Sequence, residues 1–162
     1  MAYNQWKGDL YMMKSCFLFG HRDAPQEIRS EIESAVEWLY CKKGITLFYV
    51  GHYGSFDTMA SAAVKSVKAR YEEIGLFMVI PYHPAVRPVE APDGFDGTFH
   101  PPLDNVPKRY AIVRANRYMV ENSDAIICYV NRPGNTRELL EYAARQKRNQ
   151  LEYAINLADK RK

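Results

Sequence analysis

The sequence predicts an α/β protein: a Rossmann-like three-layer sandwich with a mostly parallel sheet of about five strands flanked by helices. Short apolar segments of strand character alternate with longer segments of helical periodicity, which is typical of βαβ units. The chain has 162 residues, the length of one domain, and 47% of them are hydrophobic, enough for a packed core. We therefore expect one domain over residues 1–162, with an N-terminal extension over 1–14.

The first unit joins a strand over 15–19 to a helix that begins near Asp23. The Asp23 side chain is suited to cap backbone amides while Gln26 reaches back, and Gly44 is typical of a helix end. The apolar spacing predicts one buried face, made of Ile28, Ile32, Ala35, Val36 and Leu39.

The second unit joins a strand over 46–50 to the loop GHYGSFD over 51–57 and a helix that Gly75 closes. The inner face of that helix is predicted to be Met59, Ala60, Ala63, Val64 and Val67. A third strand over 76–80 leads into residues 81–107, which are dense in Pro and Gly and show no periodicity. Such a long connection is often a lid or a binding loop.

A third helix is predicted over about 106–122, followed by a strand over 125–130. The next helix opens at Asn135, which is suited to form a capping box with Glu138, and a fifth strand covers 153–157. The buried residues expected in these two helices are Ile112, Ala115, Met119, Val120, Leu139, Leu140, Ala143 and Ala144.

Composition excludes some classes of protein and leaves others open. The longest apolar runs fall far short of the roughly 18 residues of a membrane helix, and residues 1–14 lack the pattern of a signal peptide. We therefore expect a cytoplasmic protein without a membrane partner, in which the three cysteines are buried reduced thiols. A net charge of +3 neither demands nor forbids nucleic acid.

Candidate ligand-binding residues follow the predicted strands, because ligands of open parallel sheets bind beyond the carboxyl ends of the strands. They are Gly20, His21, Arg22, Gly51, His52, Gly54, Ser55, Tyr82, His83, Arg114, Arg117, Gly134, Asn135 and Thr136.

The glycines among these candidates suit either close approach of backbone amides to a phosphate at a helix N-terminus or a tight strand-to-helix turn. Arg22 suits bidentate phosphate contact, although a solvated surface charge is the alternative. No carboxylate or thiol accompanies the histidines at ligand spacing, so we expect hydrogen bonding or packing from them and neither a metal nor another cofactor.

The segment 81–107 is where we expect the identity of the ligand to be decided. Its residues Tyr82, His83, Arg87, Phe95, Asp96, Phe99 and His100 offer stacking faces and hydrogen-bonding groups for a base. The same residues could instead hold the loop against the rest of the protein.

Four segments together resemble the SLOG superfamily, whose name comes from the DNA-processing protein DprA and the Lonely Guy (LOG) phosphoribohydrolases. They are CFLFGHR, GHYGSFD, RANRYMVENSDAIICYV and RPGNTRELLEYA. The resemblance extends over 16–157 and is closest to small bacterial members related to YpsA. It implies a Rossmann-like fold that binds a nucleotide or nucleotide derivative in the crevice formed by the glycine loops. One role that the resemblance implies is that of a sensor for this ligand.

Two other functions follow from the same resemblance. LOG enzymes cleave an N-glycosidic bond of nucleoside monophosphates and carry the pattern P-G-G-x-G-T-x-x-E. Here the motif is shorter, and the carboxylate falls at Glu138, one position from the expected place, which is about 100° around a helix. Glu138 or Asp57 would then assist the cleavage.

Single-strand DNA binding through the basic C-terminal end is the DprA-like alternative, and nucleic acid is the less expected partner. LOG-like proteins pair through helices that flank the site, so the resemblance leaves a homodimer as one alternative. A role in binding another protein is a further alternative.

Overall fold

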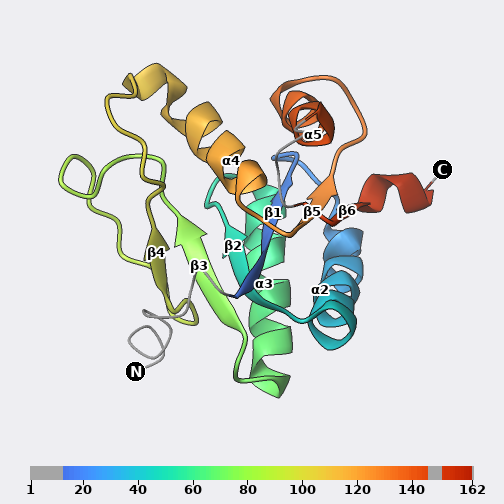
Figure 1. Ribbon diagram of the computed structural model, residues 1–162. Coiled ribbons are helices and arrows are strands. Elements are labelled where there is room, and N and C mark those ends of the chain that lie inside the picture. Colours follow the sequence, from blue (N-terminus) through green and yellow to red (C-terminus); the bar gives the residue numbers. More distant parts are fainter. Residues whose placement is uncertain (1–12, 146–150, 162) are drawn as a thin grey trace.

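A six-stranded sheet in which every paired strand is parallel forms the centre of the molecule, with the order β4-β3-β2-β1-β5-β6. The computed structural model describes residues 13–145 and 151–161 (Figure 1). The strands are β1 (Lys14–Gly20), β2 (Ile45–Val50), β3 (Gly75–Val79), β4 (Gly97–Phe99), β5 (Ala125–Tyr129) and β6 (Tyr153–Asn156).

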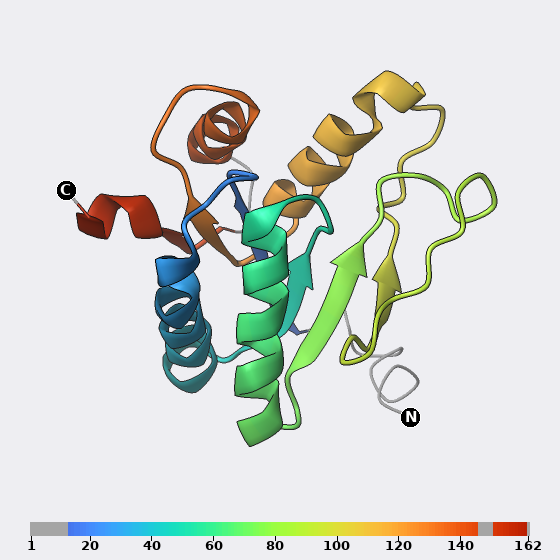
Figure 2. The same ribbon diagram turned by 180° about the vertical axis from the view of Figure 1, so that it is seen from behind.

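Helices cover both faces of this sheet, so the three-layer α/β sandwich is confirmed. The α-helices are α2 (Arg29–Lys43), α3 (Ser55–Arg70), α4 (Ala111–Glu121) and α5 (Asn135–Arg145). Short 3-10 helices are η2 (Gln26–Ile28), η3 (Lys108–Tyr110) and η4 (Leu157–Arg161). Helices α2 and α3 cover one face, whereas α4 and α5 cover the other (Figures 1 and 2).

The core is divided by the sheet into two layers because successive side chains of a strand point to opposite faces. In β1, Cys16 and Leu18 pack toward α2 and α3, whereas Phe17 and Phe19 pack toward α4 and α5. Every residue predicted for the buried faces of the first two helices is buried. A strand covered on both faces needs apolar residues throughout, which explains the continuous apolar runs in the sequence.

Three predicted core positions are wrong. Ile112 and Leu140 are only partly buried, and Ala144 is exposed. Ile112 lies in the wall of a cleft, whereas Ala144 is the next-to-last residue of α5. The prediction that all three thiols are buried is also wrong, because Cys41 on α2 is exposed.

Several predicted element boundaries differ from the structure. Helix α3 ends at Arg70, and Gly75 is the first residue of β3 rather than a helix end. Asp23 caps no helix, because Oδ1 of Asp23 instead accepts a 2.6 Å hydrogen bond from Nη2 of Arg132. Gln26, expected to complete that capping box, donates from Nε2 to Oγ of Ser55. Gly44 ends α2 as predicted, with φ at 71°.

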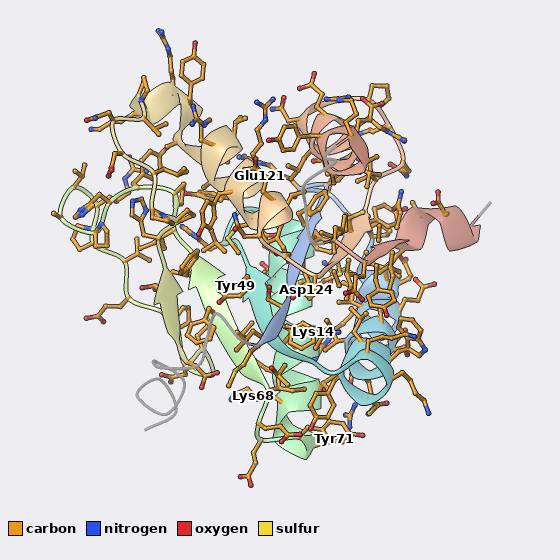
Figure 3. The ribbon with its side chains drawn as sticks, viewed as in Figure 1. Lys14, Tyr49, Lys68, Tyr71, Glu121 and Asp124 are labelled. Carbon is orange, nitrogen blue, oxygen red and sulfur yellow. The ribbon has the colours of Figure 1, made fainter. Side chains whose placement is uncertain are left out.

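The segment 81–107 contributes the short strand β4, which sequence periodicity did not indicate. Oδ2 of Asp96 accepts a hydrogen bond of 2.9 Å from the Leu76 backbone N–H and lies 3.1 Å from Nζ of Lys68. Lys68 is on the last turn of α3, near the end of the molecule where the strands begin (Figure 3). These contacts fix the return of the segment beside β3.

The described part of the chain contains no helix long and apolar enough to cross a membrane.

Candidate functional site

A cleft of about 200 Å³ opens at the carboxyl ends of the central strands. From β1 to β4 the chain adds each new strand on one side of β1, and from β5 onward it adds strands on the other side. Ligands of open α/β sheets bind at such a switch point, which here lies between β1 and β5. The cleft is bounded by the end of β1, the β2–α3 loop and the first turns of α4 and α5. Eight of the predicted functional residues line it: Gly20, Arg22, Gly51, Asp57, Arg117, Asn135, Thr136 and Glu138.

The loop before α3 is held tightly against the loop after β1. Gly54 has φ at 94°, and a Cβ atom there would lie 2.8 Å from Cα of Arg22. The backbone N–H of Ser55 donates a 2.7 Å hydrogen bond to the Arg22 carbonyl. This close approach requires glycine and brings Arg22 to the start of α3. Gly54 and Ser55 therefore shape the loop, although neither lines the cleft.

Arg22 and the N-terminus of α3 contribute positive charge beside the cleft. No side chain caps this helix, and Asp57 is the acidic residue of its first turn. Arg22 is exposed and makes no ion pair within residues 13–145 and 151–161. Such a combination favours an anionic group, and a guanidinium can contact a phosphate with two parallel hydrogen bonds.

Asp57 places a carboxyl group in the wall of the same cleft. The backbone N–H of Tyr53 donates a 2.9 Å hydrogen bond to Oδ2 of Asp57. Burial raises the pKa of Asp57 to about 7, although this hydrogen bond and the charge of Arg22 act in the opposite direction. Asp57 is thus both a brace for the loop and a carboxyl group that exchanges a proton near neutral pH.

The start of α5 forms another wall of the cleft. The Glu138 backbone N–H donates to the Gly134 carbonyl at 3.0 Å, so the helix begins with Asn135 inside its first turn. The predicted capping box between Asn135 and Glu138 is therefore wrong, since Asn135 occupies a helical position. Gly134 has φ at 136°, a conformation that favours glycine, and does not line the cleft.

Helix α4 contributes more to the cleft than the sequence suggested. Ile112, Val113 and Asn116 line it beside Arg117, whose guanidinium lies 4.8 Å from the centre of the Tyr142 ring. Arg114 is exposed and does not line the cleft. Spacing of four residues between Ile112 and Asn116 is the signal that could have indicated this helix face. Tyr53, within the loop 51–57, also lines the cleft although it was not among the predicted site residues.

The three histidines that follow strands have separate partners. His21 is buried, and its Nε2 accepts a 3.1 Å hydrogen bond from the Asn131 backbone N–H, which joins the ends of β1 and β5. Burial lowers the pKa of His21, and the charge of Arg132 lowers it further. His52 stacks on Tyr53, with ring centres 4.3 Å apart. None of these contacts places His21 or His52 in the cleft.

His83 lies in a second cavity, which adjoins the cleft at Pro81. Tyr82 also lines this cavity. No group of three or more His, Cys, Asp or Glu side chains in the described residues is arranged to hold a metal ion.

Other residues of the segment 81–107 divide between the cavity and loop anchoring. His100 lines the second cavity, and Arg87 stacks over Tyr82 at 4.1 Å from the ring centre. Phe95, by contrast, lies under Nζ of Lys65, and Phe99 packs against Tyr49. Phe95 and Phe99, like Asp96, therefore hold the segment in place.

No family model matches the sequence, and no curated protein matches it. The basic C-terminal end proposed for DNA binding falls in part on residues 146–150 and 162, which lie outside the described residues.

Proposed function

We propose that this protein binds a nucleotide or nucleotide derivative in the cleft at the carboxyl edge of the sheet. The observation that carries the proposal is Arg22, which lines the cleft beside the start of α3 and has no ion-pair partner among the described residues. Arg22 offers a guanidinium to one phosphate group, and the nearby N-terminus of α3 adds the favourable end of a helix dipole. The resemblance to the SLOG superfamily supports the same ligand class.

The remaining wall of the cleft suits the nucleoside part of such a ligand. Ile112 and Val113 provide apolar contact, while Tyr53 provides an aromatic ring. Asn116 and Asn135 carry amide groups that both donate and accept hydrogen bonds, as recognition of a sugar or base requires. A mostly apolar wall with a few polar groups is typical of small-molecule sites.

A thermal-shift series tests the proposal with AMP, GMP, CMP and UMP, and with the matching nucleosides and inorganic phosphate as comparisons. Ligand at 100 times its dissociation constant adds about 2.7 kcal/mol of stability, a rise in Tm of roughly 5–10 °C for a domain of this size. We expect a nucleotide to give such a rise and the nucleoside to give less. Absence of any shift with every nucleotide would overturn the proposal.

Matched variants separate the phosphate contact from general charge. Arg22→Ala should reduce the nucleotide-induced shift, because it removes the guanidinium from the cleft. Arg109→Ala is the control, since Arg109 is exposed on η3, stacks on Tyr110 and does not line the cleft. Equal loss in both variants would indicate nonspecific charge attraction rather than a built phosphate site.

Cleavage of an N-glycosidic bond is the second candidate function, and Asp57 is the observation that favours it. A carboxyl group with a pKa of about 7 can hold or accept a proton at neutral pH, as a general acid or base must. Glu138 lines the same cleft and would supply the second carboxylate.

Release of free base from nucleoside monophosphates, measured by chromatography, tests this candidate. Wild-type protein should release base, whereas Asp57→Asn and Glu138→Gln should not. Bound nucleotide that remains intact at high protein concentration would exclude the hydrolase and leave the binding proposal standing.

A further inference from the structure

The second cavity, beside the cleft, has a volume of about 310 Å³. The segment 81–107 and the beginning of α4 form it, and Pro81 lies in the walls of both cavities. Ligand sites in proteins occupy roughly 300–1,000 Å³. The cleft alone, at about 200 Å³, falls below this range, whereas the two spaces together fall within it. Because Pro81 lines both spaces, a ligand that reaches past Pro81 would contact both.

Two histidines in the second cavity have their ring hydrogens fixed by the backbone. Nδ1 of His83 accepts a 3.0 Å hydrogen bond from the Ala85 N–H, so in the neutral ring the hydrogen is on Nε2. Nδ1 of His100 lies 3.0 Å from the Ile80 carbonyl, which can only accept, so His100 carries its hydrogen on Nδ1. Nε2 of His83 is thus a donor and Nε2 of His100 an acceptor.

This arrangement favours hydrogen bonding to a ligand over metal binding. The two rings lie 5.5 Å apart between centres, at 76° to one another. A metal ion shared by both rings would need a lone pair on Nε2 of His83, which the Ala85 contact assigns to a hydrogen. A neutral group with both a hydrogen-bond donor and an acceptor, such as a sugar diol or a base edge, matches the pair.

The charges around the second cavity also suit a neutral group. Asp104 and Lys108 both line it, one acid and one base, so the cavity lacks the unbalanced positive charge found at Arg22. A phosphate is therefore better held in the cleft, and a ring that is linked through the phosphate is better held in the second cavity.

We infer that the ligand is a two-part molecule: a nucleoside 5′-diphosphate whose second phosphate carries another neutral polar ring, which binds between His83 and His100. The inference rests on the proposed function, because the cleft holds the nucleotide part. His83 and His100 then determine specificity by distinguishing this molecule from a mononucleotide.

Calorimetric titration of the full chain with matched probes tests the inference: ADP against ADP-ribose, GDP against GDP-mannose, and UDP against UDP-glucose. We expect at least one two-part probe to bind about tenfold or more tightly than its mononucleotide. Equal affinity within every pair would overturn the inference while the proposed function stands. Absence of binding by all six probes would overturn both.

Two substitutions remove the ligand contact while they keep the backbone contact. In His83→Asn the amide oxygen can still accept the Ala85 N–H, as in an Asx turn, and in His100→Asn the amide nitrogen can still donate to Ile80. Each should weaken the two-part probe about fivefold, the effect of one lost hydrogen bond, and leave the mononucleotide unchanged. Glu72→Gln, at an exposed turn away from both cavities, is the matched control.

Imidazole signals of the unsubstituted protein give a measurement that does not depend on the variants. In ¹H–¹⁵N spectra, the Nε2 signals of His83 and His100 should shift with the two-part probe and not with its mononucleotide. Unchanged signals at saturation, or unchanged affinity in both Asn variants, would show that the second ring binds elsewhere and would overturn the inference.

Discussion

The carboxylate of Asp57 occupies the space that any side chain at position 51 would need. A Cβ atom on Gly51 would lie 2.8 Å from Oδ2 of Asp57, the same oxygen that accepts the Tyr53 N–H. The strand-end glycine is therefore required by a carboxylate six residues later in the chain, and not by its own backbone dihedrals.

Gly51→Ala should consequently displace the Asp57 carboxyl group and break its contact with Tyr53. We expect a loss of about 1–3 kcal/mol in the free energy of unfolding, measured in urea, together with a smaller nucleotide-induced thermal shift. In an Asp57→Ala background the same substitution should cost at least about 1 kcal/mol less, because the clash is gone. Additive effects in this double-mutant cycle would contradict the steric explanation.

Asp57→Asn should make the protein more stable at high pH. Because the pKa of Asp57 is raised in the folded protein from 3.8 to about 7, the native state holds a proton that the unfolded state has released between these pH values. Stability therefore falls as pH rises through this window, and the cost is fully present above pH 7.

The Asn variant lacks this cost, so it should gain about 1–3 kcal/mol at pH 8 and nothing at pH 4. Urea denaturation at the two pH values measures the difference. Asp93→Asn, at an exposed loop position, serves as the control. A gain that does not depend on pH would show that ionisation of Asp57 is not its cause.

Gly54 and Gly134 should respond differently to alanine, although both have positive φ. Nothing lies within 4 Å of a Cβ atom at Gly134, so Gly134→Ala should cost only the backbone strain of about 1–2 kcal/mol. Gly54→Ala should cost about 3 kcal/mol or more, since it also meets the Arg22 backbone at 2.8 Å. Similar denaturation midpoints for the two variants would refute the close approach of the two loops.

His21 should make stability depend on pH in the acid range. Its pKa is lowered in the folded protein, so below the ordinary value of 6.5 the unfolded state binds more protons and stability falls as pH decreases. His21→Gln can still accept the Asn131 N–H but cannot titrate. It should therefore flatten the decline in Tm between pH 7 and pH 5, and an unchanged decline would assign it to other groups.

Asp96→Ala should loosen β4 without unfolding the sheet. The substitution removes both the acceptor for the Leu76 N–H and the partner of Lys68, at a cost of about 1–3 kcal/mol. Hydrogen exchange of residues 97–99 should accelerate, while exchange of β1 and β5 stays slow. Equal acceleration throughout the sheet would indicate that Asp96 supports the whole core and not only this strand.

The order of strands and helices could be predicted from the sequence because burial leaves a periodic record. Central strands covered on both faces need continuous apolar residues, and Ile28 to Leu39 repeat with the period of a helix that packs against them. The short strand β4 left no such record. Its three residues are only partly buried, and its pairing with β3 depends on Asp96, which acts through tertiary contacts.

The sequence by itself therefore determined the α/β class, the buried faces of α2 and α3 and the expectation that functional residues follow the strands. Only the tertiary structure decided which of these residues share a space. It brought Arg22, Asp57 and Glu138 to one cleft, joined His21 to Asn131, and assigned His83 to a second cavity beside His100. Periodicity reports local burial, whereas the convergence of side chains depends on loop conformations and helix positions that residues distant in sequence determine.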